Sequence, residues 1–146
     1  MKGSHAVPTL EDAIALAVEA HRGQRDKAGQ TYILHPLRVM LRLNGELERM
    51  VAVLHDVVED SPYTLERLRG LGYPEEVLDA LEHLTKREGE TYEAFIERVR
   101  PHALARRVKL ADLEDNMDVR RLPAVTAKDA ERLARYRAAW ARLTQA

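Results

Sequence analysis

The chain has 146 residues, with 23 lysines and arginines against 24 aspartates and glutamates, and it contains no cysteine. This length fits one ordinary domain, and the lack of cysteine excludes disulfides and thiolate metal sites. The balanced charge argues against general nucleic-acid binding, and an aromatic content of 5% disfavours a base-stacking platform. No apolar run approaches the roughly 18–20 residues of a membrane span. We therefore expect a cytoplasmic protein with neither a membrane nor a nucleic acid as its partner.

The N-terminal residues 1–8 have no apolar core that would mark a signal peptide. We expect them to be disordered or derived from an expression tag. Helical patterning begins at Thr9, because a threonine followed by Asp12 is typical of a helix with an acidic first turn. The domain is therefore predicted over residues 9–146.

Apolar residues recur three and four positions apart through most of this domain, which is the spacing of one helix face. Prolines and glycines mark most of the places where the pattern stops. The pattern predicts an all-α fold, a single bundle of six to eight helices. The predicted segments are residues 9–21, 36–43, 46–60, 64–70, 74–84, 91–99, 104–121 and 126–143.

The stretch VAVLHDVVED, residues 51–60, is ambiguous because a short apolar run suits a buried strand as well as a buried helix. A helix is favoured, since the helical pattern upstream runs into it and no second strand candidate is present to pair with it. His55 and Asp56 stand in the middle of this run. One interpretation is a hydrogen-bonded core pair in which Asp56 orients His55. The other is a metal site, because a divalent cation removes the cost of burying a carboxylate and accepts imidazole and carboxylate ligands.

Two other segments carry residues that would complete such a site. His35 stands just before a proline that can open a helix, and Asp112 lies between apolar residues of the 104–121 segment. Taken alone, His35 suits a helix cap or the surface, and Asp112 suits an ion pair with Lys109 one turn earlier. The coincidence of all three segments, each in apolar surroundings, favours one metal site.

These residues appear in the order H…HD…D, which is the signature of HD-domain metal-dependent phosphohydrolases. The stretches AHRGQRDKAGQTYILHP, VLHDVVED and VKLADLEDNM resemble the hydrolase domain of RelA/SpoT-type proteins and the small stand-alone alarmone hydrolases. The resemblance covers about residues 10–143. It implies an HD-domain helical bundle that hydrolyses a phosphorylated guanine nucleotide.

The resemblance implies a role for each matching position. The positions that match metal ligands are His35, His55, Asp56 and Asp112, and the metal is usually Mn²⁺. The pair that matches the water-activating residues is Glu59 and Asp60. The positions that match substrate-side residues are Arg22, Lys27, Asn116 and Tyr136, and Lys109 is a further candidate to neutralise phosphate charge. Two alternatives stay open, since Lys109 also suits a partner of Asp112 and Tyr136 a core residue beside Trp140.

Several departures from the family pattern fall on the substrate side. The loop between His21 and His35 is about two residues shorter, and Asp26 stands where an arginine is common. Thr31 replaces a proline, and residues 114–115, Glu-Asp, replace a basic or histidine-containing pair.

The predicted function is that of a metal-dependent nucleotide phosphohydrolase, in the preferred case a guanosine-3′,5′-bis(diphosphate) 3′-pyrophosphohydrolase. Two alternatives are kept. One is an HD-domain phosphatase that acts on another nucleotide, such as a nucleoside monophosphate. The other is a catalytically silent nucleotide-binding module.

Overall fold

Helices make up nearly all the secondary structure of residues 7–145, which are the residues that the computed structural model describes. The N-terminus predicted at residues 1–8 therefore falls almost entirely outside the described residues. The helices are α1 (Leu10–Ala20), α2 (Leu34–Leu41), α3 (Glu46–Leu54), α4 (Val57–Asp60), α5 (Leu65–Gly70), α6 (Glu75–Leu84), α7 (Tyr92–Val99), α8 (Ala103–Asn116), the 3₁₀ helix η1 (Val119–Arg121) and α9 (Ala127–Thr144). Within the described range, β pairing is limited to one isolated bridge between Arg25 and Thr31. The predicted all-α fold is confirmed.

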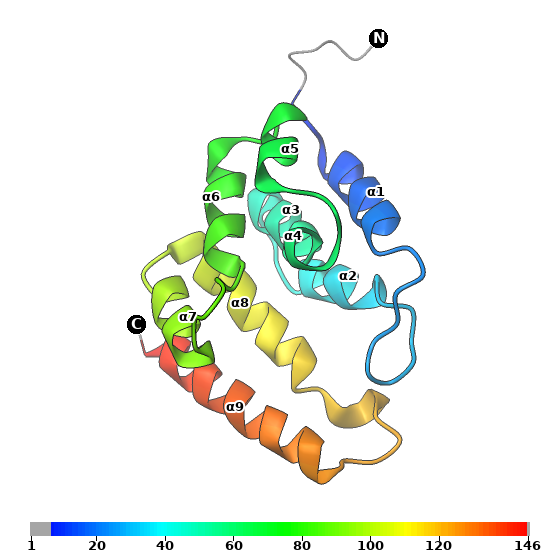
Figure 1. The fold of residues 1–146 in the computed structure, drawn as a ribbon, viewed down its shortest axis with the longest axis vertical. Coiled ribbons are helices and arrows are strands. Elements are labelled where there is room, and N and C mark those ends of the chain that lie inside the picture. The colour runs from blue at the N-terminus through cyan, green and yellow to red at the C-terminus, as the bar shows by residue number, and fades with distance from the viewer. Residues whose placement is uncertain (1–6, 146) are drawn as a thin grey trace.

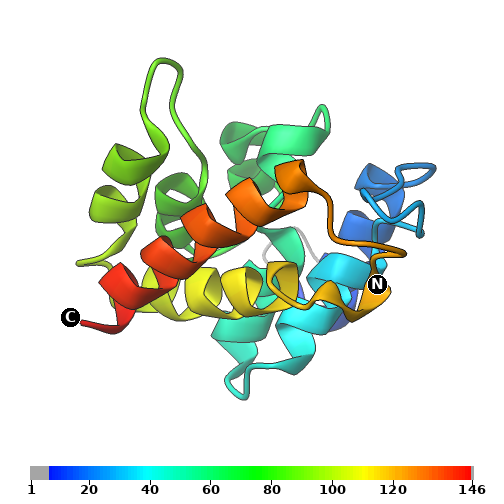
Figure 2. The ribbon, with the colours of Figure 1, turned by 90° about the horizontal axis from the view of Figure 1, so that it is seen from below.

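Helix α3 occupies the centre of the fold. It packs against α1, α2, α6 and α8, and Figure 1 shows it with α1 and α2 on one side and α6 on the other. All residues from 50 to 54 are buried, which explains why this stretch of sequence is apolar without alternation. Helix α9 packs on α7 and α8 and is inclined to α8 in Figure 2, nearest to it at the C-terminal end of α9. None of the described helices has both the length and the apolar character needed to cross a membrane.

The prediction of one helix over residues 46–60 is wrong at its centre. Helix α3 ends at Leu54 and α4 begins at Val57, so His55 and Asp56 form a junction between two helices. The backbone of Asp56 has φ −100° and ψ −3°, which departs from helical geometry. This break turns both side chains toward other helices. It brings the α-helices within residues 7–145 to nine, where six to eight helices were expected.

Threonine caps begin several helices, and the sequence predicts the first of them, at Thr9. The side-chain oxygen of each accepts a hydrogen bond from the backbone N–H three residues later, which satisfies a donor that the helix leaves free. These caps are Thr9, Thr64, Thr91 and Thr126.

Two other predicted boundaries differ from the structure. Helix α2 begins at Leu34, two residues before the proline expected to open it. The segment predicted over 104–121 ends as an α-helix at Asn116 and continues as η1. The carboxylate of Asp118 accepts a hydrogen bond from the backbone N–H of Arg120, which competes with continuing the helix.

The loop between α6 and α7 is held by Arg98. Its guanidinium donates to both carboxylate oxygens of Glu90, each at 2.9 Å, and to the carbonyl oxygen of Thr85 at 2.8 Å. The two side chains of the ion pair are only 15% and 11% exposed. The hydrogen bonds from Arg98 lower the pKa of Glu90 to about 2.

This pair predicts a specific loss of stability in acid. Because the folded state favours the ionised form of Glu90, the pair contributes stability above the ordinary pKa of 4.5 and loses it as the pH falls toward 2. We expect the Tm, followed by circular dichroism, to fall more steeply over that interval for the wild type than for Glu90→Gln. Glu66→Gln, at an exposed position, is the control and should follow the wild type. Parallel curves for the wild type and Glu90→Gln would contradict the prediction.

Candidate active site

A cavity of about 510 Å³ opens between the loop that follows α1 and the helices α2, α4, α8 and α9. Of the eleven residues that the sequence assigns to the site, nine line this cavity. They are Lys27, His35, Asp56, Glu59, Asp60, Lys109, Asp112, Asn116 and Tyr136. His55 lies directly behind the wall, where it contacts two of them.

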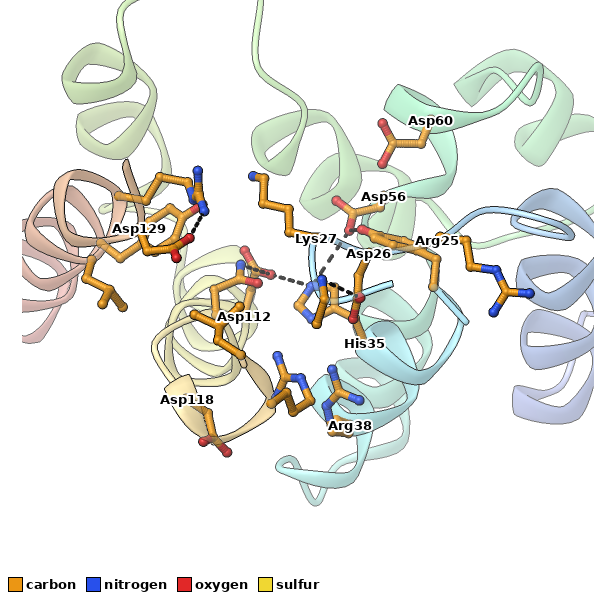
Figure 3. Close-up of a pocket in the computed structure, with 18 of the residues that line it drawn as sticks. Arg25, Asp26, Lys27, His35, Arg38, Asp56, Asp60, Asp112, Asp118 and Asp129 are labelled. Atoms are coloured by element: carbon orange, nitrogen blue, oxygen red, sulfur yellow. Dashed lines mark hydrogen bonds and ion pairs between the residues drawn. The ribbon is translucent and has the colours of Figure 1, made fainter. Parts of the chain in front are cut away.

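Two histidines meet two aspartates at the inner end of the cavity. The carboxylate oxygen Oδ1 of Asp112 lies 2.9 Å from Nε2 of His35 and 3.2 Å from Nε2 of His55. Oδ2 of Asp56 lies 3.1 Å and 3.8 Å from the Nε2 atoms of His55 and His35. Figure 3 shows Asp112 from α8 facing His35 and Asp56 across this space. Ligand atoms of His35, His55 and Asp56 all lie within 4.8 Å of one another.

The outer nitrogen of each histidine already has an acceptor. Nδ1 of His35 lies 2.7 Å from the Asp115 carboxylate, and Nδ1 of His55 lies 2.6 Å from the carbonyl oxygen of Ala52. A neutral imidazole carries one N–H, so we assign that proton to Nδ1 in both rings. Each Nε2 then presents a lone pair to carboxylate oxygens, which are acceptors too. This arrangement is repulsive unless a cation or additional protons lie between the groups.

The pKa shifts of the cluster residues also indicate that positive charge is favoured between them. Burial lowers the pKa of His55, but Asp56 and Asp112 raise it well above its usual value. Burial likewise raises the pKa of Asp112, but Lys109 and His55 hold it well below its usual range. A divalent cation supplies the missing charge without extra protons, and two imidazoles with two carboxylates are ligands that it accepts. The residues present therefore fit a divalent metal ion.

Two residues that the sequence did not assign support this cluster. The hydroxyl of Tyr32 donates a hydrogen bond to the Asp56 carboxylate, and Asp115 accepts the one from His35. Each stands three positions before or after a predicted ligand, Tyr32 before His35 and Asp115 after Asp112. Helical spacing therefore signalled that Asp115 shares a face of α8 with Asp112, whereas Tyr32 lies in the turn before α2 and had no such signal. Their partners on other helices were not visible in the sequence.

Glu59 and Asp60 lie on the wall beside the cluster, at the end of α4. The backbone N–H of Lys86 donates to Oε1 of Glu59 at 2.7 Å, which orients the carboxylate. Partial burial raises the pKa of both side chains, and the nearby charge of Asp56 raises each further. Carboxylates with raised pKa values are suited to accept a proton.

Lys109 and Asn116 both bind Asp112. Nζ of Lys109 lies 2.8 Å from Oδ2, and the Asn116 amide donates to Oδ1 at 3.2 Å. The lysine is thus the ion-pair partner of Asp112, one of its two predicted roles, while it also lines the cavity. Tyr136 is partly buried against the core and also lines the cavity.

Positive side chains gather where the loop after α1 approaches α9. Burial and the charges of Arg132 and Arg135 lower the pKa of Lys27, and both Lys27 and Arg132 line the cavity. Arg22 is not brought to this site. It is not among the described residues that line the cavity, and its side chain is 68% exposed and pairs with Glu19. Arg25 occupies the cavity wall instead.

Asp26, which departs from the family pattern, organises the shortened loop. Its Oδ1 accepts hydrogen bonds from the backbone N–H groups of Ala28 and Gln30, at 2.9 and 2.8 Å. Gly29 lies between them with φ +80°, a conformation that favours glycine. The aspartate therefore closes a tight turn at the edge of the cavity.

A second group of possible ligands, formed by Asp79, His83 and His102, differs in its protonation. Nδ1 of His102 accepts a hydrogen bond from the backbone N–H of Ala105, as the cap of α8. Its proton must therefore be on Nε2, which donates to Asp79 at 3.0 Å. Neither nitrogen of His102 offers a lone pair to a metal while it caps the helix. The two groups thus have similar residues but opposite proton arrangements.

An all-helical fold in which a His-Asp pair at a helix junction faces a histidine and an aspartate from two other helices defines an HD-type domain. No family model matches the chain. A metazoan orthologue of SpoT, described as hydrolysing ppGpp, has a solved structure with a TM-score of 0.77 to this one. The match covers 97% of this chain and 88% of that chain at 22% identity, which shows the shared fold.

Several curated proteins are similar in sequence. The chain is 38% identical over 118 residues to a guanosine-3′,5′-bis(diphosphate) 3′-pyrophosphohydrolase of Haemophilus influenzae. It is 37% identical over 138 residues to a probable protein of that name from Synechocystis sp., and 34% over 126 residues to the bifunctional (p)ppGpp synthase/hydrolase SpoT of Escherichia coli. These alignments cover 70%, 84% and 76% of this chain, but only 17%, 18% and 18% of the relatives. The chain is therefore an HD-type domain related to the SpoT/RelA-type (p)ppGpp hydrolases, and it spans less than a fifth of the length of these relatives.

Proposed function

We propose that this chain is a metal-dependent phosphohydrolase that removes pyrophosphate from the 3′ position of guanosine tetra- or pentaphosphate. The observation that carries the proposal is the pair of histidine Nε2 atoms that face the carboxylates of Asp56 and Asp112, at the inner end of a cavity whose walls carry both basic and acidic side chains. The similarity to proteins named for this reaction supports the choice of substrate. The proposed domain spans residues 9–146 and works in the cytoplasm.

The proposed metal ligands are His35, His55, Asp56 and Asp112. Their mixed nitrogen and oxygen donors suit several divalent ions, and we propose Mn²⁺, the ion that the family resemblance implies. When bound, such an ion polarises a phosphoryl oxygen and lowers the pKa of a water molecule.

Glu59 is the proposed proton acceptor, with Asp60 beside it. Because the N–H of Lys86 holds Oε1 of Glu59, the other oxygen is left to orient a water molecule and take its proton. The water oxygen forms a bond to the phosphorus that carries the 3′ oxygen, and the bond between that phosphorus and the 3′ oxygen breaks. The 3′ oxygen takes a proton as it leaves, so the products are pyrophosphate and guanosine 5′-diphosphate from the tetraphosphate, or guanosine 5′-triphosphate from the pentaphosphate.

The remaining proposed contacts bind the nucleotide. Lys27 and Arg132 are assigned to phosphate charge, since both face the cavity and other cations surround Lys27. Asn116 and Tyr136 are assigned to the nucleotide side of the cavity, and Lys109 to Asp112 and the nearest phosphate.

A nucleotide panel with identified products tests the proposal. We expect the Mn²⁺-loaded protein to release pyrophosphate from guanosine tetraphosphate, and EDTA to stop the reaction. Release of orthophosphate from nucleoside monophosphates alone would replace the proposal with the phosphatase alternative. Binding of guanosine tetraphosphate without turnover, in protein shown to hold Mn²⁺, would favour the silent binding module.

A further inference from the structure

Asp115 lies behind His35, out of contact with the cavity. It is fully buried and is not among the described residues that line the cavity. Its Oδ2 lies 2.7 Å from Nδ1 of His35, on the side of the ring opposite to the proposed metal position. A buried carboxylate at this place contacts neither substrate nor metal, so its effect must pass through the histidine.

Arginines hold this carboxylate in one orientation. Arg38 donates from Nε to Oδ1 at 2.8 Å and from its terminal nitrogen to Oδ2 at 3.1 Å, a two-point contact that fixes both position and rotation. Arg121 lies 3.6 Å from Oδ1 and donates to the backbone carbonyl oxygen of Asp115. With arginine donors on one side, the carboxylate can only accept the hydrogen bond from His35.

We propose that Asp115, clamped by Arg38, is a positioning residue that keeps the proton of His35 on Nδ1 and aims its Nε2 lone pair at the metal. A carboxylate that accepts from the outer nitrogen of a metal-binding histidine fixes its tautomer and makes it a stronger ligand. This inference rests on the metal site proposed above and deepens it.

The comparison with the other histidines supports this assignment. At His55 the carbonyl oxygen of Ala52 accepts the hydrogen bond from Nδ1. This acceptor is a backbone group, so no substitution removes it. At His102 the proton is on Nε2, and Asp79 accepts from that nitrogen instead. His35 is therefore the proposed ligand whose orientation depends on a buried side chain, that of Asp115. A substitution can change this side chain.

Mn²⁺ binding to purified wild type and Asp115→Asn, measured by calorimetry, tests the inference. We expect the dissociation constant to rise about 10- to 100-fold in Asp115→Asn, while the circular dichroism spectrum keeps its helical shape. Asp79→Asn removes a carboxylate that also accepts from a histidine but lies outside the cavity, and it should bind Mn²⁺ as the wild type does. Equal affinities of folded wild type and Asp115→Asn would overturn this inference alone. A wild type that binds no Mn²⁺ would overturn the metal site itself.

A measurement on the wild type tests which nitrogen of His35 carries the proton, even if Asp115→Asn does not fold. In protein labelled with ¹⁵N and loaded with ¹¹³Cd²⁺, we expect the cadmium to couple to Nε2 of His35 and the Nδ1 proton to be visible and slow to exchange. Coupling through Nδ1 of His35 would overturn the inference, because Asp115 would then not hold the proton there.

Discussion

Asp112→Asn is expected to remove the bound metal and to lower the turnover of guanosine tetraphosphate by about 10³-fold or more. Asp112 lies close to the Nε2 atoms of both histidines, and it supplies negative charge where the cation is proposed. Loss of several kcal/mol of charge stabilisation in the transition state corresponds to a loss of at least this size. The asparagine amide can donate to a histidine Nε2 lone pair, so the metal-free site is satisfied and the protein should stay folded.

Metal content after dialysis, measured by mass spectrometry, and pyrophosphate release check this prediction together. Asp79→Asn is the matched control, because it makes the same chemical change outside the cavity. If Asp112→Asn keeps a full equivalent of Mn²⁺, Asp112 is not a ligand.

Asp112→Ala is a less clean experiment, and the structure gives the reason. Lys109 is only 13% exposed and pairs with Asp112. Removal of one partner from a buried ion pair costs about 3–5 kcal/mol, since the other charge is left uncompensated. We expect the alanine variant to combine loss of metal with a large drop in Tm, whereas the asparagine carbonyl oxygen can still accept a hydrogen bond from Lys109 and should lower the Tm less.

Glu59→Gln is expected to retain Mn²⁺ and to lower kcat by about 10²- to 10⁴-fold, the usual contribution of a positioned general base. The glutamine carbonyl oxygen can still accept the hydrogen bond from the N–H of Lys86, so the local structure should persist. It cannot accept a proton from water. The check is kcat at saturating Mn²⁺, with the exposed Glu66→Gln as control. A wild-type kcat in Glu59→Gln would end the assignment of this base.

The pH profile gives a second signature of Glu59. Its pKa is raised above the ordinary value of 4.5 by partial burial and by the charges of Asp56 and Asp60. A base must be unprotonated to act, so kcat should fall as the pH drops through this raised pKa. The residual activity of Glu59→Gln should lack that limb of the profile.

Local signals allowed much of the fold to be predicted. Threonine caps and breaks at proline and glycine placed most helices, because these features act through hydrogen bonds within a few residues. The break at His55 and Asp56 was missed for the opposite reason. Both side chains contact residues from other parts of the chain, and the one between His55 and Asp112 spans 57 positions. No nearby residue signals such a contact.

The loop after α1 shows the same limit on the substrate side. Arg22 and Arg25 are three positions apart in a basic stretch, yet only Arg25 reaches the cavity wall. The path of the loop decides between them, and that path depends on the turn closed by Asp26 and on the bridge from Arg25 to Thr31. The family resemblance assigned Arg22 to the site and did not assign Arg25, because it does not reveal this path.

Residue type and short-range spacing allowed most of the helices and the apolar centre to be predicted from the sequence by itself, and the order of the histidines and aspartates named the candidate metal ligands. Only the tertiary structure decided which nitrogen of each histidine carries the proton. That choice depends on acceptors such as Asp115, which is 80 positions from His35 along the chain and meets it only when α2 packs on α8.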